Sequence, residues 1–117
     1  MIIPYKRDYQ KTAMGLLSYL DEFHHFKNIT EEIALCESAD DYELLFYAVN
    51  HNKIGIIGIR SSEHFATIRY VALAPGFRDA AYYRNLMSEL KAYYPKKHLT
   101  TVPEMTSLME YLKDERD

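Results

Sequence analysis

Apolar residues recur along the chain in two different periods, and the period separates predicted helices from predicted strands. Ala13, Leu16, Leu17 and Leu20 lie at helical spacing after Asp8, a residue type that caps helices. Runs of strand-forming residues, separated by turn-forming residues, predict strands. The expected elements, in order, are a strand at 1–6, a helix after Asp8, a short helix from Asn28, strands at 42–49, 54–60 and 64–74, a helix at 81–94, a strand at 98–102 and a last helix from Pro103.

Two of these segments have distinct signatures. Asn28 followed by Glu31 resembles a capping box, and Ile29, Ile33 and Cys36 form the apolar stripe of the short helix that follows. The segment IGIIGIR is a nearly continuous apolar run, which predicts a central strand that is buried on both faces.

The order of the elements predicts a single α/β domain over residues 1–117, with a mixed sheet and helices packed on its faces. Three consecutive strands form an antiparallel meander, in which 54–59 and 64–74 are expected to be neighbours. The helix at 81–94 then connects two strands as a βαβ crossover. Because open sheets of this kind bind ligands at the carboxyl ends of their strands, the turn at 75–80 is the expected place for a site.

Composition and charge narrow the class of protein. The chain has 117 residues, of which 48% are hydrophobic and 26% charged, and this fits one globular domain. Its net charge of -3 argues against a nucleic-acid partner, because such domains carry a basic surface. The sequence contains no membrane-spanning apolar run and no signal-peptide core. The single Cys36 cannot form an internal disulfide, so a cytoplasmic location is expected.

The histidines do not form a recognisable metal site. His24 and His25 are adjacent, so they do not share a helix face, and the other three are scattered along the chain. No metal is therefore expected. Cys36 together with a distant histidine is compatible with a nucleophile, but a buried structural thiol is the favoured interpretation.

The stretch APGFRDAAYYRNLM, at 74–87, contains the strongest candidate chemistry. It predicts the end of a strand, a turn at Pro75 and Gly76, and the start of a helix. The first N–H groups of a helix lack partners within the helix and lie at the positive end of its dipole. Arg78 and Arg84 flank that end, so a pyrophosphate could be held there. A surface turn with two solvated arginines is the equally weighted alternative.

At this stretch the sequence resembles the GCN5-related N-acetyltransferases, the GNAT superfamily. IRYVALAPGFRDAAYYRNLMSELKAYYP is similar to the family's acetyl-CoA motif, in which a strand and a proline are followed by (Gln/Arg)-x-x-Gly-x-(Gly/Ala). YKRDYQKTAMGLLSYL and TVPEMTSLMEYL extend the resemblance to the RibT subfamily, the small GNAT-like proteins of riboflavin operons in Gram-positive bacteria. The resemblance covers nearly the whole chain. It implies the GNAT fold, acetyl-CoA or CoA as the cofactor, and a small amine as the acceptor.

The resemblance also implies a position for each part of the cofactor. The end of the long strand would pair its backbone with the pantetheine arm, and Arg78 and Arg84 match basic positions of the motif. Ala81 and Tyr83 stand where the family has glycine and a second small residue, so both positions of closest approach are enlarged. The implied cofactor-binding residues are Val71, Ala72, Leu73, Arg78, Asp79, Ala81, Tyr83 and Arg84.

Tyr83 has three interpretations. It lies on a stripe with Met87, Leu90 and Tyr94, so its ring is expected first of all to pack under the helix. Alternatively, the ring fills and blocks the pyrophosphate groove, or its hydroxyl donates a hydrogen bond to phosphate. Packing, together with impaired cofactor binding, is the favoured interpretation.

The catalytic groups that the family uses are weakly represented. GNAT enzymes often use a glutamate on the long strand as base, but the matching stretch HFATIR has no carboxylate and Glu63 lies just before it. The family's frequent acid is a tyrosine in the last helix. Met109 stands in that place, and Tyr111 follows two residues later on a different helix face. Glu63 and Tyr111 remain as the candidate catalytic residues.

The C-terminal part departs from the family pattern. GNAT enzymes usually continue past the last helix with two more strands, for which the sequence has no room after Tyr111. The resemblance therefore implies a C-terminally truncated GNAT fold, in which the strand at 98–102 is an open edge that a homodimer would cover.

Two classes of function follow from these observations. The first is an acyl-CoA-dependent N-acyltransferase acting on a small amine, favoured by Arg78 and Arg84. The second is a non-catalytic GNAT-fold module that binds a ligand or a protein, favoured by Tyr83 and Met109.

Overall fold

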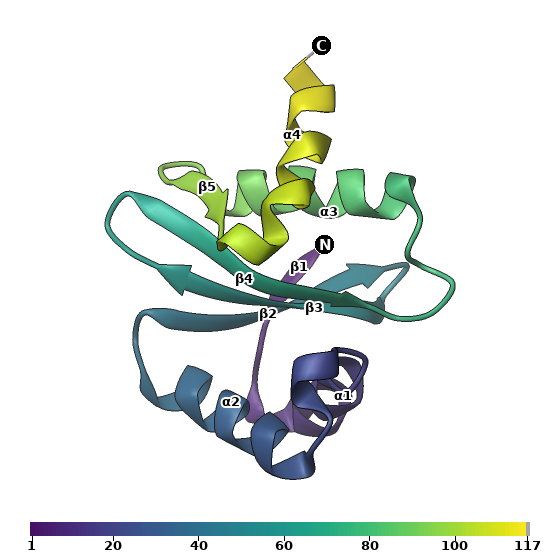
Figure 1. Cartoon of the computed structure of the whole chain (residues 1–117), viewed down its shortest axis with the longest axis vertical. Helices are drawn as coiled ribbons and strands as arrows, with labels where there is room; N and C mark the ends of the chain where they lie inside the picture. The colour runs from purple at the N-terminus through teal and green to yellow at the C-terminus, as the bar shows by residue number, and fades with distance from the viewer. Residues whose placement is uncertain (117) are drawn as a thin grey trace.

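The computed structural model of the chain shows one mixed sheet between two layers of helices (Figure 1). It describes residues 1–116, with side chains through Leu112. The strands follow one another across the sheet in chain order, antiparallel as far as β4 and parallel between β4 and β5. They are β1 (Ile2–Pro4), β2 (Tyr42–Val49), β3 (Asn52–Ser61), β4 (Phe65–Leu73) and β5 (His98–Thr101).

Helices cover both faces of the sheet. The first pair, α1 (Gln10–Leu17) and α2 (Phe26–Ser38), lies on one face, and the second pair, α3 (Ala80–Tyr93) and α4 (Met109–Arg116), lies on the other (Figure 1). Short 3₁₀ helices precede three of them: η1 (Arg7–Tyr9), η2 (Asp21–Phe23) and η3 (Pro103–Leu108). The predicted mixed α/β fold is thus confirmed, including the antiparallel pairing of β3 with β4.

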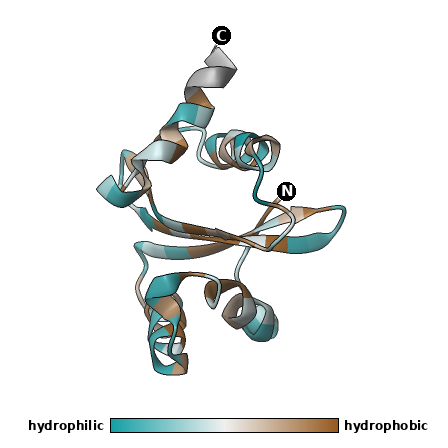
Figure 2. Ribbon diagram, turned by 45° about the vertical axis from the view of Figure 1, so that its right-hand side comes forward, coloured by the Kyte–Doolittle hydropathy of each residue, from teal (hydrophilic) through white to brown (hydrophobic). Residues whose placement is uncertain are grey.

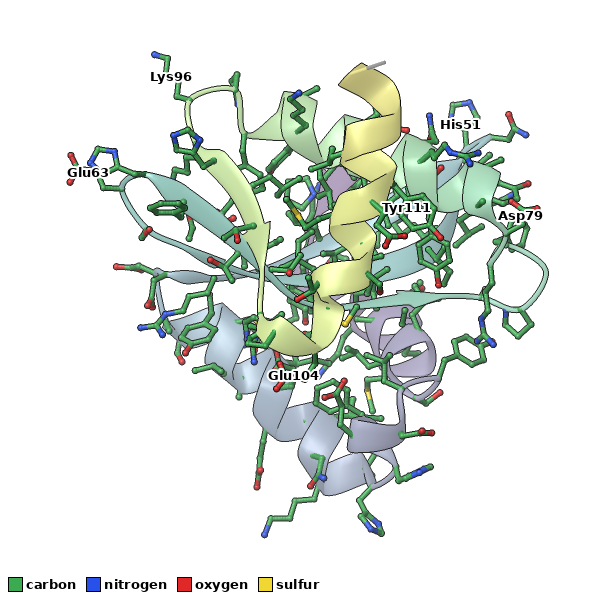
Figure 3. All side chains as sticks on the ribbon, turned by 45° about the horizontal axis from the view of Figure 1, so that its top comes forward. His51, Glu63, Asp79, Lys96, Glu104 and Tyr111 are labelled. Atoms are coloured by element: carbon green, nitrogen blue, oxygen red, sulfur yellow. The ribbon has the colours of Figure 1, made fainter. Side chains whose placement is uncertain are left out.

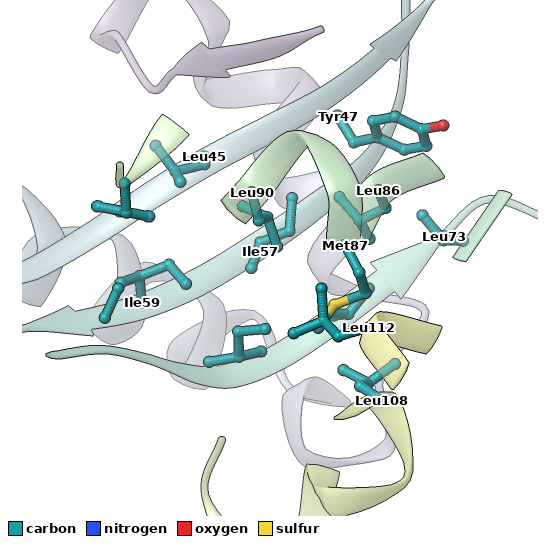
Figure 4. Packing of buried hydrophobic residues seen from close by; sticks show 14 of the residues in the cluster. Leu45, Tyr47, Ile57, Ile59, Leu73, Leu86, Met87, Leu90, Leu108 and Leu112 are labelled. Carbon is teal, nitrogen blue, oxygen red and sulfur yellow. The ribbon is translucent and has the colours of Figure 1, made fainter. Parts of the chain in front are cut away.

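Each face of the sheet has its own hydrophobic core. The central strands are coloured as hydrophobic along much of their length (Figure 2), and buried apolar residues come from the strands and from helices on both faces. On the α3 side the fully buried residues include Ile57, Ile59, Leu86, Met87 and Leu90 (Figure 4). On the α1 side they include Ala13, Leu17, Ile33, Phe46 and Ile56. Residues 54–59 of β3 are all buried, as predicted for a central strand packed on both faces.

The hairpin between β2 and β3 is also confirmed, and its turn is tight. Asn50 and His51 have φ values of 50° and 69°, so both central residues adopt the left-handed region. Two such residues in a row match the right-handed twist of the flanking strands. Asparagine and histidine tolerate this conformation better than most side chains.

Two predicted helix starts were wrong. α2 begins at Phe26 instead of after Asn28, because the N–H groups of Asn28 and Ile29 both donate to the carbonyl oxygen of His25. The expected capping box is therefore not formed. Asp8 lies inside η1, so the residue that precedes α1 is Tyr9, which makes no side-chain cap.

The last helix, predicted to start at Pro103, consists of a 3₁₀ segment followed by an α-helix. The segment from Pro103 to Leu108 forms a 3₁₀ helix, and α-helical winding begins only at Met109. A 3₁₀ turn has 3.0 residues where an α turn has 3.6, so each residue after it is rotated relative to a continuous α-helix.

β4 contains one residue more than the part of β3 with which it pairs. Tyr70 lies opposite Gly58 and Ile68 lies opposite Ile59, so Arg69 has no partner in β3. Such an extra residue is a β-bulge, which bends the strand and changes the direction of neighbouring side chains.

Within residues 1–116, no helix is both long and apolar enough to cross a membrane.

We predict that Gly58→Ala destabilises the fold. A methyl group at this position would lie 2.3 Å from Cζ of Tyr70, whose ring is buried and whose hydroxyl is hydrogen-bonded. The ring cannot move aside without losing both, so the free energy of unfolding should fall by about 2 kcal/mol or more in urea denaturation.

Gly15→Ala is the matched control for this change. Gly15 lies in α1, and apart from its chain neighbours and the backbone of its own helix no heavy atom lies within 4 Å of the added methyl group. Alanine should therefore be neutral or should stabilise the helix by up to about 1 kcal/mol. Equal stabilities of the two variants would contradict the predicted clash.

Candidate functional site

The carboxyl end of β4 has backbone groups that do not pair with β3. Ala74 N–H donates to the carbonyl oxygen of Ile54 at 2.8 Å, and Leu73 lies opposite Gly55. In an antiparallel ladder this geometry makes Leu73 a member of a non-hydrogen-bonded pair, whose own N–H and C=O groups point away from the partner strand. The same alternation applies to Val71, two residues earlier.

On the other side of β4 the ladder with β5 ends early. Its last pair joins Ile68 to Thr101, and Val102 N–H then donates to the carbonyl oxygen of Ile68 at 3.0 Å. The chain leaves β4 at this point and enters η3. The N–H groups of Val71 and Leu73 therefore face the side of β4 beyond the end of β5.

A cavity of about 250 Å³ lies against the end of β4. The segment after α1, the end of β4 and the start of α3 form its walls. Its lining residues are Tyr19, Leu20, Val71, Ala72, Leu73, Arg78 and Tyr83. The structure thus brings five of the eight predicted cofactor-binding residues into one place. The other three, Asp79, Ala81 and Arg84, are exposed around the start of α3.

Arg78 connects the turn to the end of β4. Its Nε donates to the carbonyl oxygen of Leu73 at 2.7 Å, and its guanidinium carbon lies 5.5 Å from the centre of the Tyr19 ring. This places a permanent positive charge beside the cavity. It also means that Leu73 O already has a donor within the chain.

A side chain of the chain itself caps the start of α3. Asp79 is the N-cap, and its side chain accepts a hydrogen bond from Tyr82 N–H at 3.3 Å. Its carboxylate therefore occupies part of the region where the sequence predicts a phosphate. Ala81 is exposed, so its methyl group is tolerated at this position.

These groups fit one part of CoA better than the other. The pantetheine arm is an extended chain with two amides, and an open strand edge with free N–H groups at Val71 and Leu73 suits such a chain. The pyrophosphate would meet Arg78 but would also approach the Asp79 carboxylate. The fit is therefore good at the strand and partial at the helix.

Tyr83 packs and also lines the cavity. Its ring stacks on the ring of Tyr111, with centroids 5.6 Å apart and an interplanar angle of 13°. Both rings are partly buried against the core on the α3 side. Burial raises the pKa of the Tyr83 hydroxyl, while the nearby Arg78 charge opposes that rise. The stack joins α3 to α4 at the edge of the cavity, and it brings the candidate Tyr111 next to a predicted site residue.

The other catalytic candidate lies elsewhere. Glu63 is exposed in the turn between β3 and β4, far from Asp79 at the start of α3 (Figure 3). The cavity is lined by residues at the opposite end of β4. From Phe65 to Leu73 the strand rises through eight steps of about 3.3 Å, or roughly 26 Å. Met109 lines a different cavity, beside Lys97 and His98. The structure therefore does not bring Glu63 or Met109 to the β4 cavity.

Glu32 is a buried carboxylate that the sequence analysis did not single out. Only 7% of the residue is exposed, and its oxygens accept four hydrogen bonds. Arg69 donates from Nη1 at 2.8 Å and Nη2 at 3.0 Å, Tyr70 donates from its hydroxyl at 2.7 Å, and Cys36 donates from Sγ at 3.3 Å. The network joins α2 to the bulge in β4.

The hydrogen bonds of this network shift the pKa values of Glu32 and Cys36. Burial by itself would raise the pKa of Glu32, but the hydrogen bonds from Arg69 and Tyr70 lower it below its ordinary value. Burial and the Glu32 charge raise the pKa of Cys36 to about 12, so this thiol is not an activated nucleophile. The favoured interpretation of Cys36 as a structural thiol fits this environment.

One sequence signal could have revealed Glu32. It lies within the predicted apolar stripe of α2, next to Ile33 and between Ile29 and Cys36 in helical phase. A carboxylate on an apolar face must find a partner, because burial of an unpaired charge is costly. Its partner lies 37 residues away, at a position that helical periodicity cannot identify.

Among the side chains that the structure describes, which end at Leu112, no group of three or more histidine, cysteine or carboxylate residues could hold a metal ion.

We predict that Glu32→Gln destabilises the protein in a pH-dependent way. Removing one partner of a buried ion pair costs about 3 kcal/mol or more, because the other charge stays buried. The pKa of Glu32 is lowered by folding, so its contribution to stability is present above the unfolded-state pKa and is lost as the pH falls through the folded-state pKa. The difference between wild type and variant should therefore be large at neutral pH and smaller in acid.

Urea denaturation at neutral and acidic pH measures this difference. Glu31→Gln is the matched control, since Glu31 is an exposed neighbour on the same helix whose nearest cation, Lys27, is 3.9 Å away. It should change the free energy of unfolding by no more than about 0.5 kcal/mol. A Glu32→Gln defect of the same size at both pH values would contradict the prediction.

No protein-family model matches the chain. In sequence it is similar to an uncharacterized N-acetyltransferase encoded in the lysA 3′ region of Bacillus methanolicus. The two are 28% identical over 100 residues, which cover 85% of this chain and 83% of that relative.

Solved acetyltransferase structures have the same arrangement of elements. The aminoglycoside N-acetyltransferase AAC(6′)-Iy in complex with CoA has a TM-score of 0.71 at 13% identity, over 97% of this chain and 84% of that one. A possible acetyltransferase from Clostridium difficile 630 has a TM-score of 0.73 at 13% identity, over 100% and 89% of the two chains. A GNAT family acetyltransferase from Staphylococcus aureus has a TM-score of 0.66 at 16% identity, over 86% and 83%. The chain therefore has the fold of the GNAT acetyltransferases.

Proposed function

We propose that the chain is an acyl-CoA-dependent N-acyltransferase that acts on a small amine. The observation behind this proposal is the open edge of β4, where the N–H groups of Val71 and Leu73 face a cavity beyond the end of β5. The similarity to an N-acetyltransferase in sequence, and to an enzyme in complex with CoA in structure, supports the proposal.

The residues around the cavity have separate tasks in this proposal. Val71 and Leu73 hold an extended pantetheine arm through their N–H groups, as strands hold one another. Arg78 leaves the carbonyl oxygen of Leu73 and pairs with phosphate. Acyl-CoA, when bound, would supply the acyl group as a thioester, and CoA would leave as the thiol. Tyr111, held beside the cavity by its stack on Tyr83, is the candidate that protonates the leaving thiolate.

The acceptor is proposed as a small amine. AAC(6′)-Iy was solved with a bisubstrate analogue that joins CoA to a neamine derivative, which shows that this fold accommodates an amine-bearing molecule beside CoA. A link to riboflavin metabolism, and closeness to the RibT subfamily, are the finer part of the proposal, and they rest on the sequence resemblance. A cytoplasmic location is proposed because the single Cys36 cannot form an internal disulfide.

A homodimer is also proposed. Among residues 1–116, β5 is the last strand of the sheet and pairs with β4 alone, so its outer edge offers free backbone groups. Edges of this kind are commonly paired or covered, and a second copy of the chain would cover this one.

A non-catalytic ligand-binding module is the second candidate. The observation that favours it is the Asp79 carboxylate at the start of α3, which repels a phosphate from the amide groups that would bind it. The distance of Glu63 from the cavity also favours it, since no carboxylate base lies on β4 itself. Binding of CoA without turnover of any amine would distinguish this candidate from the enzyme.

Calorimetric titration with acetyl-CoA and with CoA tests the proposed site. Arg78→Ala should weaken the binding of both ligands by about 1 to 3 kcal/mol, because a charge-assisted hydrogen bond to phosphate is lost. Arg7→Ala is the control, since Arg7 is an exposed arginine whose guanidinium pairs with Glu37 instead. Unchanged affinity in Arg78→Ala would place the ligand elsewhere, and no binding by the wild type would refute the proposed cofactor.

Substitutions of Tyr83 distinguish packing from obstruction. Tyr83→Gly should lower the free energy of unfolding by about 2 kcal/mol or more through loss of the stack, and should change CoA affinity little. Tyr83→Phe keeps the ring and should preserve both stability and affinity, which thermal unfolding and calorimetry measure.

Tyr82→Gly is the control for the backbone effect of glycine. Tyr82 is the neighbouring residue in the same helical turn, and its ring packs on Phe77 instead. If Tyr83→Gly binds CoA about tenfold more tightly than Tyr82→Gly, the ring obstructs the groove. If Tyr83→Phe alone weakens binding, the hydroxyl contacts phosphate.

A further inference from the structure

We propose that Glu32 is a positioning residue that acts through Arg69 and the bulge in β4. In this proposal it orients the Val71 N–H group toward the carbonyl oxygen of an acyl thioester. The inference rests on the proposed function, because it concerns how the same cavity distinguishes an acylated cofactor from a free one.

The bulge sits between the paired and the open parts of β4. Ile68 is the last residue paired with β5, Arg69 is the unpaired extra residue, and Val71 is the first residue whose backbone groups point away from β3 beyond the bulge. The direction of Val71 N–H therefore depends on the conformation at Arg69. A strand that slipped back by one residue would exchange the two directions, because side chains and backbone groups alternate with period two.

Contacts around Arg69 hold this conformation from several sides. The guanidinium forms the two-pronged pair with Glu32, and its central carbon lies 4.7 Å from the centre of the Tyr42 ring. The side chain of Arg69 is 22% exposed and that of Glu32 is 7% exposed, so water competes weakly with the pair. A bidentate pair fixes orientation as well as distance.

The next residue is held by the same carboxylate. The Tyr70 hydroxyl donates a hydrogen bond to Glu32, and the Tyr70 ring lies over Gly58. Phe23 contacts the same ring in a T-shaped arrangement, with ring centroids 5.3 Å apart. Arg69 and Tyr70 are consecutive, yet both side chains reach α2 on one face of the sheet. In a regular strand, two consecutive side chains point to opposite faces of the sheet. Glu32 therefore binds two side chains that lie on the same face only because of the bulge.

The role differs from simple stabilisation. A buried ion pair contributes little net stability compared with apolar residues of similar volume, so the pair is not needed to fill the core. It is needed to keep two successive polar side chains on the same face. Replacement of the whole network by apolar residues should therefore separate stability from positioning.

The test compares acetyl-CoA with CoA, by calorimetry and by the amide chemical shift of Val71. Wild type should bind acetyl-CoA about three- to tenfold more tightly than CoA, from one added hydrogen bond to the thioester carbonyl. The Val71 amide signal should shift with acetyl-CoA more than with CoA. In Glu32→Gln the preference should fall to about onefold, while Glu31→Gln should keep it.

The apolar triple variant Glu32→Met, Arg69→Met and Tyr70→Phe is the control for loss of the preference through unfolding alone. It should recover most of the stability lost in Glu32→Gln, because no charge stays buried alone, and it should still lack the preference for acetyl-CoA. Arg69→Lys, which keeps the charge but not the two-pronged geometry, should retain the wild-type preference only in part. A stable triple variant that prefers acetyl-CoA as wild type does would overturn the proposed role of Glu32.

Amide chemical shifts of the ligand-free protein test the role of Glu32 independently of the proposed function. If wild type binds neither acetyl-CoA nor CoA, the proposed function fails, and the Val71 and Leu73 amide signals still report on the strand edge. These signals should move in Glu32→Gln and stay in place in Glu31→Gln. If they stay in place in both variants, Glu32 does not position the edge.

Discussion

The extra residue in β4 is the constraint on which the candidate site depends. Without the extra residue Arg69, backbone groups and side chains would alternate regularly along the whole of β4. The end of the strand would then continue the pattern of the part that pairs with β5. The interruption places a guanidinium and a phenol on one face, next to an apolar helix. Glu32 makes this arrangement tolerable, because it neutralises the charge and accepts hydrogen bonds from both side chains. The carboxylate on α2 and the open strand edge are therefore two parts of one feature.

The sheet was predictable from the sequence because its signals are local. The continuous apolar run of β3 and the turn residues before it are enough to place a central strand and a hairpin. Helix starts were harder, because Asn28 and Asp8 are good capping residues that other backbone contacts displaced. The bulge could not be seen, since one extra residue in a strand leaves the apolar pattern nearly unchanged. Its partner Glu32 was visible only as a carboxylate in an apolar stripe, and pairing across 37 residues requires the tertiary fold.

The candidate site was predictable in part, for reasons that differ by residue. The strand end and Arg78 follow from the resemblance to the GNAT motif, and the structure gathers them around one cavity. Packing of Tyr83 followed from the helical stripe, but its partner Tyr111 did not. Met109 and Tyr111 lie on different faces of α4, as predicted, because Met109 lines a cavity beside His98 while Tyr111 stacks on Tyr83. The 3₁₀ segment Pro103–Leu108 rotates both residues relative to a helix that is continuous from Pro103, so the face of α4 that meets α3 could not be deduced from the sequence.

Charges at the turn indicate which part of a ligand the site recognises best. Arg78 already donates to Leu73 O, and Asp79 already accepts from Tyr82 N–H, so a phosphate must displace one contact and tolerate a nearby carboxylate. An amide chain along the strand edge displaces only solvent from the N–H groups of Val71 and Leu73. Hydrogen bonds exchanged within the protein contribute less to affinity than hydrogen bonds added to unpaired groups. For a CoA-type ligand, recognition should therefore concentrate on the pantetheine and thioester end, which is the end that Glu32 is proposed to position.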